Sequence, residues 1–454
     1  MEDIMVPKQT NQLDTPGTKE RFSSTGFILA AIGSAVGLGN MWKFPYITGQ
    51  YGGGAFFLLF IACLLVVGLP VLLAELAIGR AGRGSASSSF VKAGGGKIWG
   101  VFGLLSVIAP FVIMTFYSLV AGWTLHYAVL SFSGQLFNNT DFGGQFSSFT
   151  GGYMPIIWGA IVAVITGFVV VKGISGGIEK FNKVLIPGML VLLVILMIRS
   201  ITLPGGMEGV SFFLSPDFSK LTPESALVAL GHAFFSLSLG MGTMITYGAF
   251  VNRQQSLGSA TVAVGAGDML YALIAGLIIF PTTFAFNIPA DAGPGLVFVA
   301  LPAAFSAMPL GWLFGGLFFV LLGIAALTSL VSLLQVPVSY AMEKWNLRRS
   351  TAVWIMAGLV FLLSIPSALS MGLMPDLKIN NMPVFDFVDF VASNWFLPLS
   401  GLVVTLFAGY FWKNVAEEAG LTQKWFRIWL FMLRYIAPIL VLFVFLYSAQ
   451  IIKL

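Results

Sequence analysis

The sequence predicts an all-α integral membrane protein with about eleven membrane-spanning helices, and three observations support this prediction. Hydrophobic residues make up 57% of the chain and charged residues only 9%, whereas soluble proteins carry about 25% charged residues. Apolar stretches of roughly 20 residues, the length that crosses a bilayer, recur along the chain. The alternation over about ten residues that marks a membrane β-barrel strand is absent. Backbone groups in lipid must pair internally, so the spans are expected to be helices.

The apolar stretches divide the chain into two halves of five spans and one further span. We expect a tail over 1–22, a first half over 23–200, a connection over 201–225, a second half over 226–411, and a loop with the last span over 412–454. The candidate spans lie near residues 23–50, 54–80, 98–132, 153–172, 177–199, 226–252, 257–287, 310–342, 350–370, 384–411 and 425–452.

The distribution of Lys and Arg predicts the orientation in the membrane. If the N-terminus lies inside, the inner segments hold most of these residues, and the outer segments hold only Arg199, Lys220, Lys378 and Lys453. Inner segments of membrane proteins are enriched in Lys and Arg. We therefore expect a multi-pass protein of the cell membrane with a cytoplasmic N-terminus and tail and an extracellular C-terminus. The connection over 201–225 is then extracellular, and the loop after residue 411 is cytoplasmic.

Composition excludes several other classes of protein. The net charge of +5 is small, and we interpret it as membrane topology, with no nucleic-acid partner expected. Cys63 is the single cysteine and there are two histidines, which argues against a disulfide framework and a transition-metal site. No nucleophile–base set is evident, so we do not expect an enzyme. His232 is expected to be a buried, hydrogen-bonded histidine. The oligomeric state stays open.

Two spans at corresponding positions of the two halves are rich in glycine and small polar residues. They are residues 33–40 in the first span and residues 235–242 in the sixth. Such interrupted spans indicate a transporter binding site, because the broken ends expose backbone N–H groups toward an anion and carbonyl groups toward a cation. The alternative is that these glycines only allow close helix packing. Hydroxyl and amide side chains in both stretches favour the binding site.

Three motifs carry a resemblance to a known family. They are the stretch from Gly33 to Tyr46, the stretch from Gly52 to Phe56, and the stretch from Pro70 to Arg80 that contains Glu75. From about residue 19 to 411 the chain resembles the bacterial branch of the neurotransmitter:sodium symporter family. The resemblance implies the leucine-transporter fold, in which two inverted five-helix repeats with broken helices 1 and 6 hold the substrate at mid-membrane.

The resemblance also implies a site for an amino acid. Backbone amides and the Tyr117 hydroxyl would bind its carboxylate, freed carbonyls its ammonium, and an apolar pocket its side chain. Monoamine transporters of the family carry an aspartate where this chain has Gly37, so the substrate should bring its own carboxylate. The flexible Met241 favours a broad range of hydrophobic substrates. The implied substrate-binding residues are Ser34, Ala35, Leu38, Gly39, Ile113, Tyr117, Phe235, Ser236, Ser238, Met241, Ser329 and Leu333.

Two sodium sites follow from the same resemblance, and their oxygen ligands suit a hard cation. The first site maps onto Ala35, Asn40, Ser236 and Asp268. The second maps onto Gly33, Val36, Ala325, Thr328 and Ser329. An alternative for the Thr328 and Ser329 hydroxyls is hydrogen bonding to the helix carbonyls one turn earlier.

Asp268 is a carboxylate inside an otherwise apolar span, which indicates a functional residue. Many family members have asparagine there, and chloride-dependent members place a serine one turn later, where this chain has Ala272. We therefore expect Asp268 to supply the negative charge that chloride supplies in those proteins, and transport to be independent of chloride. A further hypothesis is that Asp268 takes up a proton on the return step.

The resemblance implies two gates. Lys43 and Asp389 match the outer pair, where lysine replaces the usual arginine and cannot form its two-pronged contact. Lys19 or Arg21 is expected to pair with Glu343 on the inner side. Gly177 and Pro187 would mark a segment of the fifth span that unwinds to let water reach the second sodium site. An ordinary helix kink is the equal alternative.

The sequence thus predicts a sodium-coupled symporter that imports hydrophobic L-amino acids, aliphatic and aromatic, by alternating access. A proton-coupled amino acid porter of the same fold is the main alternative. An ion channel would also use carbonyls and carboxylates at mid-membrane, but it would not need an apolar pocket with a tyrosine hydroxyl.

Overall fold

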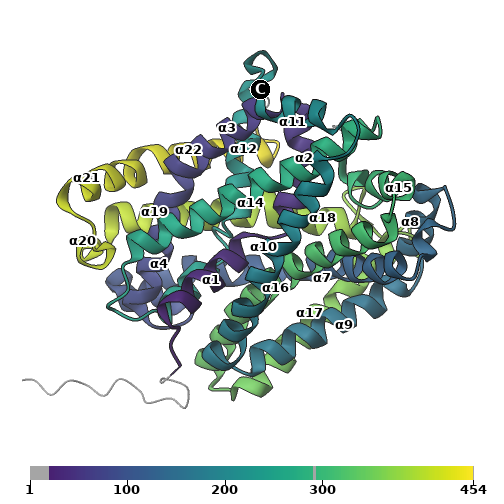
Figure 1. Cartoon of the computed structure of the whole chain (residues 1–454). Coiled ribbons are helices and arrows are strands. Elements are labelled where there is room, and N and C mark those ends of the chain that lie inside the picture. Colours follow the sequence, from purple (N-terminus) through teal and green to yellow (C-terminus); the bar gives the residue numbers. More distant parts are fainter. Residues whose placement is uncertain (1–19, 290–292, 453–454) are drawn as a thin grey trace, which may run out of the picture.

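The structure is a computed structural model that describes residues 20–289 and 293–452 as a bundle of helices (Figure 1). The α-helices of the first half are α1 (Ser24–Ala35), α2 (Leu38–Gln50), α3 (Gly54–Cys63), α4 (Leu69–Gly82), α5 (Ala86–Phe90), α6 (Gly96–Gly103), α7 (Leu105–Phe132), α8 (Phe142–Thr150), α9 (Met154–Val171), α10 (Lys180–Ile201) and α11 (Gly206–Leu214). Those that follow are α12 (Pro223–Ser236), α13 (Thr243–Ala249), α14 (Leu257–Ala285), α15 (Ala300–Ala307), α16 (Gly311–Trp345), α17 (Arg349–Ser370), α18 (Val384–Val391), α19 (Leu397–Leu406), α20 (Val415–Ala419), α21 (Gln423–Phe431) and α22 (Ala437–Ser448).

Short elements complete the chain. Strands β1 (Lys378–Ile379) and β2 (Met382–Pro383) pair in antiparallel register. Single π-helical turns, several of which continue one α-helix into the next, are Leu64–Gly68, Val91–Gly95, Ile174–Glu179, Ala392–Phe396, Phe407–Phe411 and Met432–Ile436. Three 3-10 turns are Gln135–Phe137, Phe218–Lys220 and Gly293–Leu296.

The described helices account for the predicted spans. Within residues 20–289 and 293–452, nine continuous helical segments are long and apolar enough to cross a membrane, and α1 with α2 forms a tenth span that bends by 44° at its break. The predicted span near 226–252 corresponds to α12 and α13, which residues 237–242 separate. This break is too long for the pair to count as one continuous helix, so the sixth span appears in the structure as two short helices.

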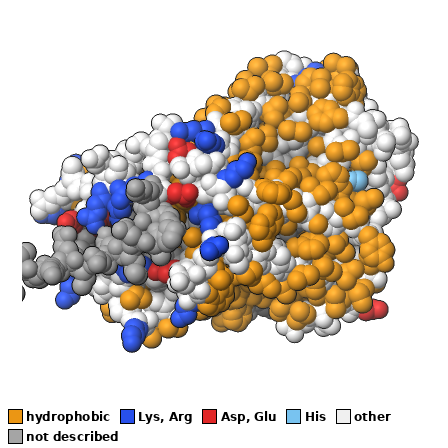
Figure 2. Space-filling view, turned by 90° about the horizontal axis from the view of Figure 1, so that it is seen from below, with side chains coloured by type: hydrophobic (Ala, Val, Ile, Leu, Met, Phe, Trp, Pro, Cys, Tyr) orange, Lys and Arg blue, Asp and Glu red, His pale blue; other side chains and the backbone are white. Residues whose placement is uncertain are grey.

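The outer surface of the bundle is suited to lipid. Apolar side chains stand exposed on α9 and α17, namely Ile157, Ile161, Val164, Phe168, Trp354, Ile355, Leu359 and Leu362. These helices run along the lower side of the molecule in Figure 1, and the view from below shows hydrophobic side chains over much of this face (Figure 2). Most of the visible Lys and Arg side chains gather at one end of it (Figure 2). This pattern matches a membrane belt beside a charged aqueous face.

The centre of the bundle is built around the long helices α7 and α16, which pack along each other. Helix α1 lies against α16, α10 and α14, and α13 packs tightly on α4. Gly79 and Gly248 allow the last contact, because a Cβ at either position would overlap a carbonyl oxygen of the facing helix. Small residues at such crossings let membrane helices approach closely. The broken helices are thereby held in the middle of the molecule.

Candidate functional site

The break in the first span frees backbone groups at the centre of the bundle. Helix α1 ends at Ala35 and α2 begins at Leu38, with Gly37 at its N-cap. The carbonyl oxygen of Ser34 accepts hydrogen bonds from the hydroxyls of Ser238 at 2.7 Å and Ser329 at 3.3 Å. Side chains from the sixth and eighth spans therefore satisfy a carbonyl that the interrupted helix leaves unpaired.

The break between α12 and α13 depends on residues with positive φ. Ser238, Gly240 and Gly242 have φ values of 54°, 74° and 64°. A Cβ at Gly240 or Gly242 would also overlap a backbone carbonyl oxygen of a neighbouring helix. The N–H of Gly240 donates to Oε1 of the buried Glu75 on α4 at 2.7 Å. Glycine provides the conformation, and Glu75 pairs a backbone donor that the break leaves free.

A small cavity of about 20 Å³ lies between the two breaks. All the predicted substrate-binding residues except Leu38 line it, together with Gly37, although their role in binding remains a prediction. The lining residues are Ser34, Ala35, Gly37, Gly39, Ile113, Tyr117, Phe235, Ser236, Ser238, Met241, Ser329 and Leu333. This volume holds about one water molecule, so an amino acid would fit only after side chains around the cavity move.

The cavity is polar at one end and apolar at the other. The N–H of Leu38 donates to the Tyr117 hydroxyl at 2.9 Å, so Leu38 contributes its backbone without lining the cavity. A Cβ at Gly37 would lie 2.8 Å from the Ser329 hydroxyl oxygen and 3.0 Å from that of Tyr117. No side chain fits at residue 37 without displacing these groups. Among the other lining residues, the large apolar side chains are those of Ile113, Phe235, Met241 and Leu333, and the hydroxyl-bearing ones are Ser34, Ser236 and Ser238.

Three of the four residues predicted for the first sodium site form one hydrogen-bonded cluster beside the cavity. Oδ1 of Asp268 accepts from the Asn40 amide at 2.7 Å and from the Ser236 hydroxyl at 2.5 Å. Asp268 is fully buried, and its Oδ2 has no hydrogen-bond partner among the described residues. A buried carboxylate oxygen without a partner is costly. This arrangement fits a bound cation, and Ala35 adjoins the cluster at the end of α1.

The residues predicted for the second sodium site lie where α1 faces α16. The Thr328 hydroxyl donates to the carbonyls of Ile324 at 3.1 Å and Ala325 at 3.0 Å. Hydrogen bonding to carbonyls of the same helix is the alternative that the sequence analysis gave for Thr328. The lone pairs of the hydroxyl oxygen are still available to accept a hydrogen bond or to bind a cation. Ser329 reaches across to α1, as described above. The structure thus joins Ser329 to the end of α1, and Ala325 and Thr328 lie on the same helix α16, which packs against α1.

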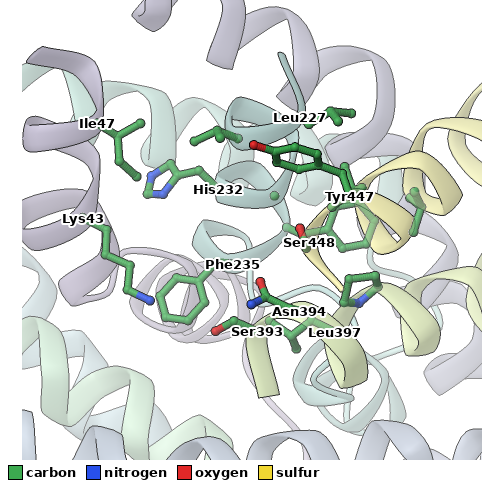
Figure 3. Close-up of a pocket in the computed structure, with 16 residues that line it drawn as sticks. Lys43, Ile47, Leu227, His232, Phe235, Ser393, Asn394, Leu397, Tyr447 and Ser448 are labelled. Atoms are coloured by element: carbon green, nitrogen blue, oxygen red, sulfur yellow. The ribbon is translucent and has the colours of Figure 1, made fainter. Parts of the chain in front are cut away.

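The predicted outer pair is in contact in the structure. Nζ of Lys43 lies 3.3 Å from Oδ2 of Asp389 and 5.1 Å from the centre of the Phe235 ring. Beside this pair is a second cavity of about 200 Å³, between α2, α12, α19 and α22. Figure 3 shows Lys43, His232 and Phe235 on one side of this cavity and Tyr447 and Ser448 on the other.

Among the described residues, Arg21 does not pair with Glu343 as one form of the predicted inner pair requires. Glu343 pairs with Lys92 at 2.6 Å and accepts hydrogen bonds from the backbone N–H of Ser85 and the hydroxyl of Ser88. The carboxylate of Glu343 lies at the N-terminus of α5. It is therefore bound by Ser85, Ser88 and Lys92, where Arg21 was expected. Lys19, the other expected partner, lies outside the described residues.

The N-terminal segment is held by the fifth span instead. A Glu20 carboxylate oxygen accepts from the backbone N–H of Ile174 at 2.9 Å, and Glu179 accepts from the N–H and the hydroxyl of Ser23. Gly177 lies in the π-helical turn Ile174–Glu179 and Pro187 lies within α10. The segment between them is helical here, and this geometry is compatible with both the unwinding segment and the kink.

Three polar residues near the site were not predicted from the sequence to bind substrate or sodium. Glu75 ties α4 to the break in the sixth span, and His232 contacts Asn40 as the sequence analysis expected of a hydrogen-bonded histidine. Asn182 on α10 is fully buried, and its Oδ1 lies next to Gly33 without a hydrogen-bond partner among the described residues. The signal that could have found all three is a polar side chain inside an apolar span.

Known proteins resemble this chain over nearly its whole length. The model of the sodium:neurotransmitter symporter family matches residues 19–141 and 152–453. An uncharacterized sodium-dependent transporter of Bacillus subtilis, YhdH, is 36% identical over 93% of this chain and 96% of its own. Another from Haemophilus influenzae is 35% identical over 92% of this chain and 96% of its own.

A solved structure shows the same architecture. The crystal structure of MhsT in complex with L-phenylalanine matches with a TM-score of 0.88 and 45% sequence identity, over 94% of this chain and 99% of that chain. This match confirms the leucine-transporter fold that the resemblance implied. The family model covers nearly the whole chain, and the broken helices of the chain meet in the middle of the bundle. The protein therefore belongs to the sodium:neurotransmitter symporter family.

Proposed function

We propose that the protein is a sodium-coupled symporter that imports hydrophobic L-amino acids, both aliphatic and aromatic, by alternating access and without chloride. One observation carries this proposal most directly. The cluster of Asn40, Ser236 and Asp268 adjoins a cavity that has backbone donors and a tyrosine hydroxyl at one end and an apolar wall at the other. Such a cavity suits a zwitterion with an apolar side chain, bound next to a cation.

The chemistry of the cavity selects the class of substrate. Its lining contains no Asp, Glu, Lys or Arg, so a charged substrate side chain would be buried without a partner, which is unfavourable. The substrate carboxylate would face the N-terminus of α2 and Tyr117, and its ammonium would face the freed carbonyls near Ala35, Phe235 and Ser236. MhsT was crystallised with L-phenylalanine, an aromatic member of the proposed class. Met241 and Leu333 would move to admit such side chains.

Sodium is the proposed coupling ion at two sites. In the first, Oδ2 of Asp268, which has no hydrogen-bond partner in the described part of the chain, would be a ligand together with Asn40, Ser236 and the Ala35 carbonyl. In the second, the carbonyls of Gly33, Val36 and Ala325 would join the Thr328 and Ser329 hydroxyls. The carboxylate of Asp268 would balance the sodium charge, so a chloride ion is not required beside it.

The remaining proposals concern gating and topology. Lys43 and Asp389 close the outer path, and unwinding between Gly177 and Pro187 opens the inner one. The two inverted repeats span 23–200 and 226–411, joined by the extracellular connection 201–225. The protein would lie in the plasma membrane as a transporter and not as an enzyme, with the N-terminal tail 1–22 and the loop after 411 inside and the C-terminus outside.

A proton-coupled porter is the alternative that the site itself suggests, because a buried carboxyl group can hold a proton in place of a cation. Equilibrium binding distinguishes the two. Purified protein should bind labelled L-leucine and L-tryptophan in sodium gluconate as well as in sodium chloride, and should bind neither in choline chloride. Binding that is independent of sodium, or that is lost when gluconate replaces chloride, contradicts the proposal.

A further inference from the structure

His232 is a buried histidine in direct contact with the cluster proposed to bind the first sodium ion. It lies on α12, one turn before Ser236, and is 5% exposed. Its Nε2 is 3.0 Å from Oδ1 of Asn40. The imidazole stacks on Phe44 with the ring centres 5.3 Å apart and also contacts Phe60. The imidazole therefore packs against two aromatic rings, and its Nε2 lies within hydrogen-bond distance of the asparagine oxygen.

The hydrogen atoms in this cluster determine which way each bond runs. Nδ2 of Asn40 lies 2.7 Å from Oδ1 of Asp268, and an ionised carboxylate only accepts hydrogen bonds. The amide nitrogen of Asn40 therefore faces Asp268, and the amide oxygen faces His232. Because that oxygen accepts, the tautomer of His232 is the one in which Nε2 carries the hydrogen and donates.

The Ser236 hydroxyl lies within reach of two acceptors but has one hydrogen to donate. Its oxygen is 2.8 Å from Oδ1 of Asn40 and 2.5 Å from Oδ1 of Asp268. When Ser236 donates to the carboxylate, its oxygen lone pairs are free for a cation, and His232 is then the donor left on the Asn40 oxygen. This is the arrangement that cation binding requires, because both the Asn40 and the Ser236 oxygens must have a lone pair available.

We propose that His232 is a positioning residue for the first sodium site. The Nε2–H group holds the Asn40 amide so that its oxygen is presented to the cation and its NH₂ group to Asp268. Without this donor only the contact with Asp268 sets the orientation of the amide, so its oxygen is held less firmly toward the cation. The proposal rests on the proposed function, since it concerns the same sodium site, and it assigns a role in sodium affinity to a residue outside the ligand set.

The surroundings of His232 allow a clean substitution. The residue also lines the 200 Å³ cavity, in which Figure 3 shows its ring beside Ile47 and near Lys43. Side chains of similar or smaller volume therefore have room. Glutamine keeps an N–H donor at similar reach from the backbone, whereas leucine fills similar space without one. Phe60→Leu is a matched control, because it removes a ring contact of His232 but leaves the hydrogen bond to Asn40.

Sodium alone serves as the probe. A ligand that binds only the folded protein raises its melting temperature with concentration, so we would titrate sodium against choline without amino acid present. The sodium concentration that gives a fixed rise in melting temperature should be about three- to tenfold higher in His232→Leu, which corresponds to one hydrogen bond of ordinary net strength. It should stay within about twofold of the wild type in His232→Gln and Phe60→Leu. Amino acid affinity at saturating sodium should change little.

The outcomes separate the inference from the proposed function. If the wild type shows no stabilisation by sodium, the proposed function itself fails. If the wild type responds and His232→Leu responds equally, or His232→Gln is weakened as much as His232→Leu, then His232 is packing alone and the inference is wrong. Should His232→Leu not fold, His232→Met makes the same comparison with a more flexible side chain.

Discussion

Asp268 is the residue on which the proposed ion chemistry depends most. Its Oδ2 is buried without a partner among the described residues, and its Oδ1 orders Asn40 and Ser236. Asp268→Asn removes the fixed negative charge and keeps the size of the side chain. We expect the sodium concentration for half-maximal uptake to rise roughly tenfold or more, as for a close buried charge interaction, and chloride to become stimulatory. Uptake titrated with sodium, in chloride and in gluconate, measures both effects.

Asp389→Asn is the control for this substitution, because it removes a carboxylate from the outer pair with Lys43, away from the sodium cluster. It should change the rate of uptake without creating a response to chloride. If Asp268→Asn neither weakens sodium activation nor responds to chloride, the role of the carboxylate as a fixed counter-charge is wrong.

Met241 is expected to set the size of substrate that the cavity admits. It is buried in the apolar wall with Ile113 and Leu333. Met241→Phe adds a rigid ring to a cavity of about 20 Å³, and overpacking of this kind costs about 1–3 kcal/mol. We predict that uptake of tryptophan falls about tenfold or more while uptake of alanine is nearly unchanged. Competition of the two amino acids against labelled leucine tests this, and an equal loss for both would contradict it.

For individual residues, the sequence predicted which ones lie close together, but it could not predict which hydrogen bonds they form. The motif around Gly37 and the mid-span carboxylate Asp268 were sufficient to place both in the site. The contact of His232 with Asn40 joins residues far apart in the chain, and the shared hydrogen of Ser236 depends on distances of a few tenths of an ångström. Neither of these two features can be detected in the amino-acid sequence.

At the scale of elements, the break in the sixth span depends on a contact with α4. Glu75 accepts the N–H of Gly240, and an unsatisfied buried donor costs about 1–3 kcal/mol. Glutamine retains an acceptor oxygen and leucine does not. We therefore expect Glu75→Leu to lower the melting temperature and the uptake rate strongly, and Glu75→Gln to retain most of both. Thermal unfolding in detergent and uptake in liposomes check this, and two equally damaged variants would refute it.

A substitution in helix α10 can distinguish between unwinding of the fifth span and a simple kink in it. Pro187 lies within this helix and is exposed on its outer side, so Pro187→Ala disturbs little packing. Alanine restores a backbone donor that proline lacks and should stabilise the wound helix. If unwinding releases sodium, turnover should fall about three- to tenfold while sodium-dependent binding is unchanged. Unchanged turnover would favour the kink.

The elements differ in how well the sequence predicted them. Apolar length located the spans, and the glycine and hydroxyl stretches located both breaks, because these properties are local. The inner pair was predicted from the resemblance, and among the described residues Glu343 contacts α5 and Lys92 and not Arg21. That contact depends on how the short helix α5 folds back, and apolar periodicity carries no information about it.

For the whole molecule, the distribution of Lys and Arg predicts the topology. In a background without the native thiol, Cys63→Ala, we expect a cysteine at Asp376 to react with a membrane-impermeant maleimide on intact cells. A cysteine at Glu417 should react only after permeabilisation. Both positions are exposed in the structure, so accessibility reports their side of the membrane. The reverse pattern would invert the proposed orientation.

The architecture of the whole molecule was largely predictable, because lipid restricts the chain to helices and long motifs tie it to one family. The size of the central cavity was not predictable, since it depends on the packing of Met241, Phe235 and Leu333 around the breaks. Substrate range depends on that packing and on its movement, and therefore calls for measurement.

The central claim is that a sodium gradient drives the uptake of a hydrophobic amino acid. We would reconstitute the protein in liposomes and follow labelled leucine and tryptophan under an inward sodium gradient, under an inward proton gradient without sodium, and with no gradient. The account predicts accumulation above the external concentration with the sodium gradient alone. Equal accumulation with the proton gradient, or no dependence on sodium, would contradict it.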